Sequence, residues 1–361
     1  MSVVAWFAVR LLLKQSIPKR SGELKLDGLQ GVVRVCRDPF GVPTIEAENV
    51  SDLLFAQGFV QAQDRLWQME LNRRLGAGRL AELFGEEALA ADIFLRRLGL
   101  RRAAETHLAA LDDEERVLLE AYCAGVNASI AQTKVLPVEF RLLRVRPEQW
   151  CPLDTLTWVN VMSMDLSSNW EQELLRGRIL EKLGTEGAEI LHLFSKSAAL
   201  TVPPSGQGPE VLEGLWELYD KAKSYLPNGG LPGASNAWAV SGERTFSGRP
   251  LLASDPHLVG RVPSVWYESR LICSELEVRG AGFPGVPFII IGANTKVSWG
   301  ITNSFADTMD LYMEKLDGSD YQVPQGLQPL EVRVEEIEVK GRGTHREIVE
   351  TTRHGPILFR T

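Results

Sequence analysis

Hydrophobic and polar positions follow two different periods in the two halves of the chain. In the first half, apolar side chains recur at helical spacing, which predicts helices at residues 53–85, 101–131 (one or two helices) and 170–184. Ser51 and Asp52 are candidate N-caps of the first helix, and Gly184 is the expected end of the last. Residues 31–47 alternate on either side of a Pro-Phe-Gly turn, which is typical of a β-hairpin.

In the second half the apolar positions alternate with period two, as in strands that are buried on one face. The candidate strands are residues 236–242, 249–255, 264–273, 287–292 and 296–302. Between the halves, residues 195–214 are rich in Ser, Pro and Gly and are expected to be a linker, with a short helix over 212–226. A mainly helical part followed by mainly antiparallel strands predicts an α+β protein rather than a doubly wound one.

Composition and charge narrow the class of protein. The chain has 361 residues, 44% of them hydrophobic and 24% charged, which is usual for a globular protein. Its formal net charge of -8 argues against a nucleic-acid partner, because phosphate binding needs a basic surface. The four cysteines lack metal-ligand spacing and are expected to be small core residues. Residues 1–25 are expected to be the remnant of a signal peptide or membrane anchor, with a surface amphipathic helix as the alternative.

Ser235 stands where a loop rich in Gly and Pro, residues 227–234, meets a candidate strand. A nucleophile elbow does not fit, because the second glycine of that motif is missing and a strand follows instead of a helix. An N-terminal nucleophile does fit. If the chain were cut between Ala234 and Ser235, the new α-amine, with a reference pKa of about 7.7–8.0, could serve as the base for the serine's own hydroxyl. The alternative is a plain junction between loop and strand.

Several stretches resemble the penicillin acylase (penicillin amidase) family. "GASNAWAVSGERTFSGRPLLASDPH" is similar to the start of that family's catalytic chain, and "RDPFGVPTIEAENVSDLLFAQGFVQAQDRLWQMELNRRLGAGRLAELFG" to its N-terminal signature. "GFPGVPFIIIGANTKVSWGITNSFADTMDLYMEKL" and "TTRHGPIL" resemble later segments, in the family's order. The resemblance implies the four-layer αββα sandwich of N-terminal nucleophile hydrolases. It also implies a precursor that cuts itself into two chains, which stay associated as a heterodimer.

By this resemblance, residues 26–196 would form the mainly helical small chain and residues 197–234 a removable spacer. Residues 235–361 would be the first part of the catalytic chain. The sheet is then expected to be incomplete, because the family's catalytic chain continues further. An extracytoplasmic or periplasmic location is expected from the apolar N-terminal run, with the N-terminus as a candidate membrane anchor.

The resemblance also implies roles for individual residues. Ser235 would attack an amide carbonyl to form an acyl-enzyme, and His257 would position the serine and tune its amine. The backbone N–H of Asn303 would be one donor to the oxyanion. Met162, Leu166 and Leu258 would line a pocket for an apolar acyl group.

Many members of the family hold a structural calcium ion, which takes oxygen ligands. The expected ligands are Asp307, the Met309 carbonyl, Asp310 and Glu171, with Glu173 as the alternative to Glu171. No organic cofactor is expected.

The expected activity is hydrolysis of a linear amide, which releases a carboxylic acid and an amine such as a β-lactam nucleus, as in antibiotic metabolism. Two alternatives remain open: an acylase of N-acyl homoserine lactones, and a non-catalytic, calcium-bound secreted relative. Substrate profiling separates the first from a penicillin acylase, and failure to self-cleave would favour the second.

Overall fold

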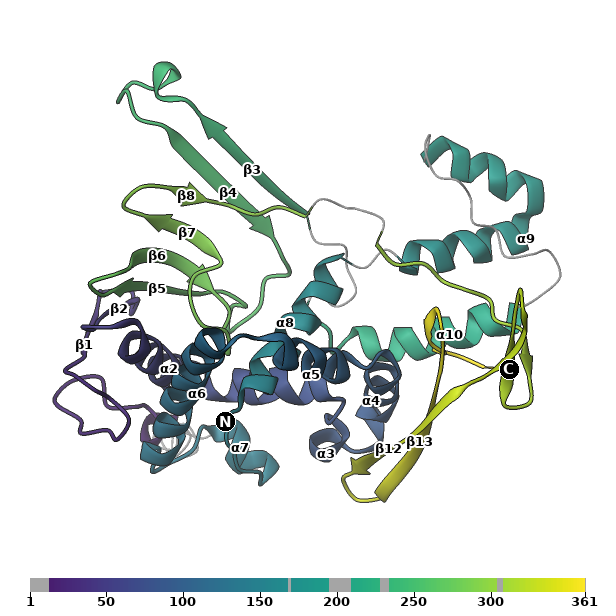
Figure 1. Cartoon of the computed structure of the whole chain (residues 1–361), viewed down its shortest axis with the longest axis horizontal. Helices are drawn as coiled ribbons and strands as arrows, with labels where there is room; N and C mark the ends of the chain where they lie inside the picture. The colour runs from purple at the N-terminus through teal and green to yellow at the C-terminus, as the bar shows by residue number, and fades with distance from the viewer. Residues whose placement is uncertain (1–12, 168–169, 195–208, 228–233, 304–307, 361) are drawn as a thin grey trace, which may run out of the picture. The chain divides into compact units, whose positions relative to one another are not determined.

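The structure is a computed structural model that describes residues 13–167, 170–194, 209–227, 234–303 and 308–360 (Figure 1). The helices are α2 (Val50–Ala77), α3 (Ala81–Phe84), α4 (Glu86–Leu98), α5 (Leu100–Ala110), α6 (Asp113–Gln132), α7 (Val138–Leu143), α8 (Pro152–Ser167), α9 (Trp170–Phe194), α10 (Pro209–Lys223) and the 3-10 helix η1 (Gly242–Arg244). The mixture of helices and mostly antiparallel sheets confirms the α+β class.

In the part of the chain that the structure describes, the strands form four separate sheets. The strands are β1 (Arg34–Arg37), β2 (Pro43–Glu46), β3 (Ala234–Val240), β4 (Leu251–His257), β5 (Tyr267–Ile272), β6 (Glu277–Gly282), β7 (Ile291–Asn294), β8 (Ser298–Trp299), β9 (Leu316–Asp317), β10 (Asp320–Val323), β11 (Gly326–Pro329), β12 (Glu331–Val339), β13 (Gly343–Thr352) and β14 (Gly355–Pro356).

The chain divides into two compact units, each of which draws on segments from both sides of Ser235. The first comprises Met1–Gly76, Arg101–Val161 and Gly233–Thr302, and the second comprises Ala77–Leu100, Met162–Pro232 and Asn303–Thr361. The predicted boundaries at residues 25, 196 and 234 concern processing and not packing, so they stay predictions. Residues 197–208 and 228–233 of the expected spacer and residues 1–12 of the expected anchor lie outside the described residues.

The predicted N-cap of the first helix is wrong. Helix α2 is capped by Asn49, whose Oδ1 accepts the N–H of Asp52 at 2.8 Å, so Ser51 and Asp52 lie inside the first turn. The Asp52 carboxylate instead turns back to accept the N–H groups of Gln30 and Gly31, both at 2.9 Å.

The predicted break at Gly184 is confirmed. Two helical stretches of α9 meet there at a kink, where Gly184 has a φ of 53°, a conformation that glycine adopts without steric cost. The helix then continues to Phe194, beyond the predicted end.

The six-stranded sheet of the first unit has the order β1-β2-β5-β6-β7-β8. The predicted N-terminal hairpin is confirmed as β1 and β2, which pair antiparallel. Strand β2 then pairs in parallel with β5, so the hairpin extends the sheet formed after Ser235. On one face of this sheet, Tyr267 and Leu271 are buried against Leu53 and Phe59 of α2 (Figure 1). Removal of such apolar surface from water is the main source of stability here.

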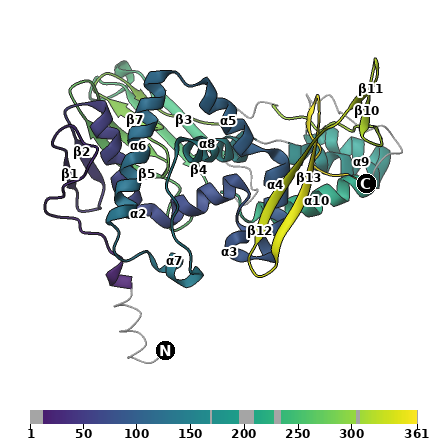
Figure 2. The same ribbon diagram turned by 60° about the horizontal axis from the view of Figure 1, so that its bottom comes forward.

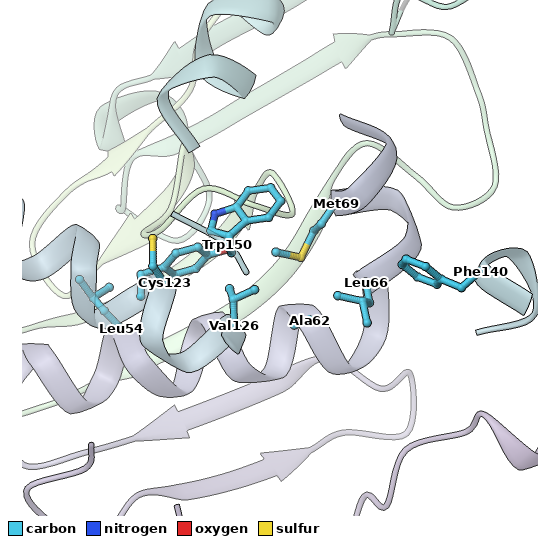
Figure 3. Close-up of a cluster of buried hydrophobic side chains, with 9 residues drawn as sticks. Leu54, Ala62, Leu66, Met69, Cys123, Val126, Phe140 and Trp150 are labelled. Carbon is cyan, nitrogen blue, oxygen red and sulfur yellow. The ribbon is translucent and has the colours of Figure 1, made fainter. Parts of the chain in front are cut away.

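Helices α2 and α6 cross at two glycines. A Cβ atom on Gly125 would stand 1.7 Å from the carbonyl oxygen of Phe55, and one on Gly58 would stand 2.2 Å from the carbonyl oxygen of Tyr122. Only glycine permits so close an approach of two backbones. The close crossing forms the buried cluster drawn in Figure 3, whose members are Leu54, Ala62, Leu66, Met69, Tyr122, Cys123, Val126, Phe140 and Trp150.

A set of side chains from the N-terminal helices holds the backbone of residues 283–288. Gln57 both donates to the carbonyl of Phe288 at 3.0 Å and accepts its N–H at 2.9 Å. Gln61 and the Tyr122 hydroxyl both accept the N–H of Gly285, at 3.0 and 3.1 Å.

The Thr155 hydroxyl donates to the carbonyl of Gly285 at 2.8 Å. We call Gln57, Gln61, Tyr122 and Thr155 the amide clasp. At these positions the segment has no neighbouring strand to bind its main-chain groups. The clasp provides their hydrogen-bond partners, so they are not buried without any.

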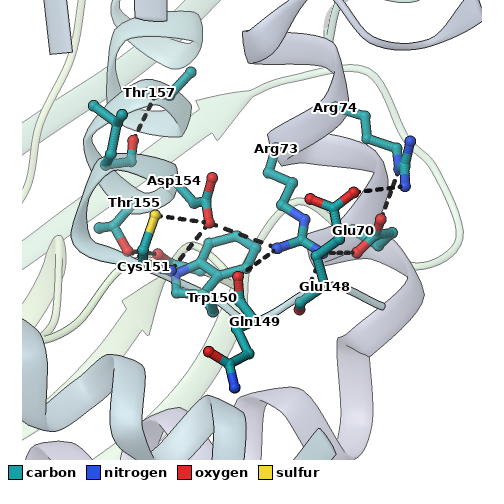
Figure 4. A network of polar contacts seen from close by, with 12 residues as sticks. Glu70, Arg73, Arg74, Glu148, Gln149, Trp150, Cys151, Asp154, Thr155 and Thr157 are labelled. Atoms are coloured by element: carbon teal, nitrogen blue, oxygen red, sulfur yellow. Dashed lines mark hydrogen bonds and ion pairs between the residues drawn. The ribbon is translucent and has the colours of Figure 1, made fainter. Parts of the chain in front are cut away.

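Figure 4 shows a buried ion network that ties α2 to the chain before α8. Glu70 accepts from Arg73 and, at 2.6 Å, from Arg74. Arg73 also donates to the carbonyls of Glu148 and Gln149, at 3.1 and 3.0 Å. The two arginine side chains and the Glu70 carboxylate are almost fully buried. Buried charges are tolerated only when they are paired, so the network favours one position of the 148–151 segment.

The second unit has an aromatic centre, in which Trp170 of α9 and Tyr219 of α10 meet at 4.7 Å between ring centroids and both approach Phe94 of α4. Asp92, also on α4 and fully buried, accepts the N–H groups of Leu80 and Ala81 at 2.8 and 2.7 Å. Asp92 therefore caps the first turn of α3 from a neighbouring helix.

Strands β12 and β13 form the long hairpin that is yellow in Figure 2, and they pair over nine residue positions. In the turn of this hairpin, the backbone N–H of Lys340 donates to the carbonyl oxygen of Ala81 at 3.0 Å. Among the helices of the described ranges, none is both long and apolar enough to cross a bilayer.

The cysteine prediction holds for one residue and fails for another. Cys123 is buried, and burial raises the pKa of its thiol. Cys36, by contrast, is exposed on β1, because the two-stranded end of the sheet leaves that face uncovered. Cys151 and Cys273 are half-buried, and all four thiols are free.

Candidate active site

Ser235 lies at the start of a two-stranded hairpin in the first unit. Strands β3 and β4 pair antiparallel, with Ser235 opposite Pro256 and Ala234 opposite His257 (Figure 1). The hairpin turns through η1, where a Cβ on Gly242 would meet the carbonyl of Gly248 at 2.5 Å. The predicted strand after Ser235 is therefore confirmed, whereas residues 228–233 of the predicted loop lie outside the described residues. The peptide bond expected to be cut, Ala234–Ser235, joins the first two residues of β3.

The hydroxyl group of Ser235 faces a second hydroxyl group. Its Oγ lies 2.6 Å from Oγ1 of Thr302, and the same Oγ1 lies 3.4 Å from the Ser235 carbonyl oxygen. Thr302 was not among the residues expected from the sequence. Its only signal there is its place next to Asn303 in "SWGITNS".

The segment that carries Thr302 packs closely on β4. Ser254 donates to the carbonyl of Ile301 at 3.4 Å, and a Cβ on Gly300 would stand 2.5 Å from the Cβ of Ser254. Glycine at position 300 thus permits the contact between this segment and the hairpin.

The backbone of His257 lies opposite Ala234, next to the expected cleavage position. Its side chain, however, lies on the face of the hairpin opposite to that of Ser235. Because side chains alternate along a strand and directly opposite residues share a face, His257 shares the face of Ala234, and Ser235 has the opposite one. The imidazole Nε2 lies 2.8 Å from Oδ2 of Asp255, and both side chains are substantially exposed. Asp255 therefore orients the ring.

The remaining predicted pocket and oxyanion residues fall in different units. Asn303, the first residue of the second unit, donates its side-chain amide to the carbonyl of Leu166. The predicted oxyanion role concerns the backbone N–H of Asn303 and not this side-chain amide, and it stays a prediction. Met162 is buried on α8 in the same unit. Leu258 is half-buried in the first unit, directly after His257.

The predicted calcium ligands fall in the second unit. Asp307 lies outside the described residues, whereas Met309 and Asp310 precede Leu311, whose N–H donates to Oε2 of Glu173 at 3.0 Å. Of the two alternatives for the helical ligand, Glu173 is therefore the carboxylate that meets this segment of chain.

Glu171 is engaged elsewhere. The Tyr219 hydroxyl donates to its Oε1 at 2.9 Å, and burial together with this carboxylate raises the pKa of Tyr219. Within the described ranges, no group of three or more His, Cys, Asp or Glu side chains is gathered closely enough to hold a metal ion. The oxygen donors present fit calcium in kind, and Asp307 would have to complete the set.

The arrangement around Ser235 suits nucleophilic chemistry, because the serine hydroxyl is held by the neutral hydroxyl of Thr302 at the start of a strand. Comparison with known proteins assigns the chain to a family. The family model described as penicillin amidase matches residues 32–361. This chain belongs to the penicillin amidase family. The resemblance inferred from the motifs is thereby confirmed, and the membership agrees with the expected class of N-terminal nucleophile fold.

Curated relatives of this penicillin amidase family member are named penicillin acylases or acyl-homoserine lactone acylases. "Penicillin acylase 2 proenzyme" of Pseudomonas sp. (strain SE83) is 39% identical, over 97% of this chain and 46% of that protein. "Acyl-homoserine lactone acylase QuiP" of Pseudomonas aeruginosa is 32% identical, over 95% of this chain and 42% of that protein. The chain thus spans about half the length of these curated relatives.

A solved structure, the thermostable penicillin G acylase from Alcaligenes faecalis, is 28% identical, with a TM-score of 0.40. That match covers 49% of this chain and 98% of the solved chain.

Proposed function

We propose that this chain belongs to a self-processing amide hydrolase, in which cleavage between Ala234 and Ser235 creates the catalytic N-terminus. The observation that carries the proposal is the position of Ser235, on the first strand after a Gly- and Pro-rich junction, with its Oγ held 2.6 Å from Thr302. The word "proenzyme" in the name of the 39% identical relative supports processing.

In the proposed reaction, Ser235 Oγ attacks the carbonyl carbon of a linear amide and the amine leaves, so that an acyl-enzyme remains. Water then releases the carboxylic acid. The free α-amine of Ser235 acts as the base, because its reference pKa of about 7.7–8.0 suits proton transfer near neutral pH. The backbone N–H of Asn303 stabilises the oxyanion, and His257, oriented by Asp255, positions the amine.

The same chemistry has a second candidate substrate. Several relatives that are 30–33% identical are named acyl-homoserine lactone acylases, so an N-acyl homoserine lactone is the alternative to a penicillin-type amide. Initial rates with a phenylacetyl amide and with a series of N-acyl homoserine lactones of increasing chain length separate the two.

We keep a structural calcium ion as part of the proposal, held by Asp310, the Met309 carbonyl, Asp307 and one of Glu171 and Glu173. These oxygen donors are of the kind that calcium prefers. Metal analysis of the purified protein tests it. An extracytoplasmic location, with residues 1–25 as signal or anchor, also stays a prediction.

The deciding experiment is expression of the whole reading frame, beside a Ser235→Ala variant, followed by intact mass and N-terminal sequencing. We expect two associated chains, one of which begins Ser-Asn-Ala-Trp, and an uncut variant. A wild-type protein that stays in one piece would remove the free amine, and a non-catalytic relative would then be the better description.

A further inference from the structure

We propose that Thr302 is a positioning residue for Ser235, whose hydroxyl holds the serine Oγ in place for the cut that precedes Ser235. This inference rests on the proposed function. Its basis is the 2.6 Å distance between the two hydroxyl oxygens, together with the 3.4 Å distance from Thr302 Oγ1 to the Ser235 carbonyl oxygen. One threonine side chain thus contacts both the side chain and the backbone of the serine.

Thr302 comes from a part of the first unit that is anchored in the six-stranded sheet as well as packed on β4. It follows β8, which pairs with β7 in the six-stranded sheet. Trp299 of β8 donates its indole N–H to the carbonyl of Ile290 at 2.9 Å, which fixes the strand a few residues before Thr302.

Ser235, by contrast, lies on the β3–β4 hairpin, which forms a sheet of its own. The contact with Thr302 therefore fixes the position of the serine hydroxyl relative to the six-stranded sheet. A nucleophile gains rate from such fixed placement, because less freedom is lost on the way to the transition state.

Cleavage of the Ala234–Ser235 peptide bond depends on where the Ser235 Oγ atom lies. A bond forms between Ser235 Oγ and the carbonyl carbon of Ala234, the C–N bond between the two residues breaks, and the hydroxyl proton ends on the Ser235 nitrogen. Water then hydrolyses the ester, giving its hydroxyl to the Ala234 carboxyl group and a proton back to Ser235 Oγ. The first step requires one rotamer of Ser235, with Oγ directed at the preceding carbonyl group.

A threonine hydroxyl can select that rotamer without taking part in proton transfer. It both donates and accepts a hydrogen bond, and it does not ionise near neutral pH. His257 is on the other face of the hairpin, so its side chain does not duplicate this contact with the Oγ side of Ser235. Thr302 therefore acts through Ser235, as a positioning residue and not as a base.

The test compares Thr302→Val, which keeps the shape and loses the hydroxyl, with Thr302→Ser, which keeps the hydroxyl. Thr295→Val, in the exposed turn between β7 and β8, is the matched control for the same substitution on the same hairpin. All are made in the whole reading frame, and the appearance of the new chain beginning at Ser235 is followed by intact mass. Loss of one neutral hydrogen bond predicts cleavage about 10-fold slower in Thr302→Val. Thr302→Ser and Thr295→Val are expected to stay within about threefold of wild type.

A second readout separates positioning from general stability. In the uncut Ser235→Ala background the serine hydroxyl is absent and only the longer contact of Thr302 Oγ1 with the carbonyl oxygen of residue 235 remains, so adding Thr302→Val should lower the denaturant midpoint only slightly. Equal cleavage rates for wild type and Thr302→Val would overturn the inference. So would failure of Thr302→Ser to restore the rate, or a drop in midpoint caused by Thr302→Val that is as large in the uncut background as in the background that keeps Ser235. If wild type itself is not cut, the proposed function fails, and that outcome is visible before any variant is compared.

Discussion

At the scale of single residues, Asp92 is the carboxyl group whose surroundings most clearly alter its chemistry. It is fully buried, and this burial raises its pKa from 3.8 to about 6, although two backbone N–H groups oppose the shift. Because the folded pKa lies above the unfolded one, the folded state binds the proton more tightly. The resulting stabilisation is fully present below about pH 4 and is lost as the pH rises through about 6.

We therefore predict that Asp92→Asn changes the pH dependence of stability. The free energy of unfolding of the variant minus that of wild type should rise by up to about 3 kcal/mol from pH 4 to pH 7. The reason is that wild type must ionise a buried carboxyl group over this range and the variant has none. Denaturant unfolding across this range measures it. Asp317→Asn, at an exposed position, is the control for loss of one charge. An offset for Asp92→Asn that stays constant with pH would contradict the prediction.

Sequence reasoning at this scale finds residues that a local pattern marks and misses those that only a distant contact defines. Ser235 stands out because a Gly-rich loop ends at it. Thr302 does not, because its partner is 67 residues away and nothing in the local pattern distinguishes one strand-end threonine from another. Asn49 was missed as the cap for a different reason: three polar residues that can cap a helix follow each other there, and only the contact of Asp52 with Gln30 and Gly31 decides between them.

At the scale of elements, α2 organises the first unit. Its apolar positions bury against the sheet and α6, and its buried glutamines bind the backbone of residues 283–288 through the amide clasp. The helix kinks at Arg65, where φ is -135°. Beyond the kink, Arg65 and Gln68 both donate to the carbonyl of Ser264 at 2.9 Å.

We predict that Gln57→Ala lowers the free energy of unfolding by about 1–3 kcal/mol, because it leaves the partly buried N–H and carbonyl groups of Phe288 without their partner. Gln63→Ala is the matched control, because helical geometry places position 63 roughly 120° around the helix from Gln57. Its effect should stay within about 0.5 kcal/mol. Equal losses for the two variants would show that the clasp adds nothing specific.

The predicted elements have one apolar face, although β12 was missed despite its alternating "EVRVEEIEV" sequence. Helix α8, which was not predicted, mixes Trp158, Val161 and Met162 with buried Thr157 and is covered on several sides, so no single stripe marks it. Strand β6 was missed because its "EVRGAG" sequence ends in small residues. A Cβ on Gly280 would stand 2.0 Å from the carbonyl oxygen of Ile291, so the close approach of β7 demands those glycines.

At the scale of the whole molecule, residues before and after Ser235 are joined within one sheet. The parallel pairing of β2 with β5 links positions 44–46 to 270–272, and no local pattern could have predicted it. If the chain is cut as proposed, this pairing and the amide clasp become contacts between two separate chains. Such contacts hold the products of cleavage together as the expected heterodimer.

Unfolding of the processed protein should therefore depend on its concentration, whereas unfolding of the uncut Ser235→Ala variant should not. For two chains that separate on unfolding, each tenfold rise in concentration adds about 1.4 kcal/mol of apparent stability. Guanidinium midpoints over a hundredfold range of concentration test this. A processed protein whose midpoint does not move would mean that the two chains do not separate when they unfold.

The amide clasp has a consequence for how the sequence can vary. Gln57, Gln61, Tyr122 and Thr155 all bind main-chain atoms of residues 283–288, so the clasp holds the path of the segment and not its side chains. Gly285 is an exception, because a Cβ there would stand 3.0 Å from the ring of Trp150 and its φ is +98°. Phe283 is constrained as well, because it is buried with its ring centroid 4.7 Å from that of Trp266, and Phe288 has a φ of 66°. The other positions of the segment can exchange residues over evolutionary time, while the helices that hold it must keep theirs.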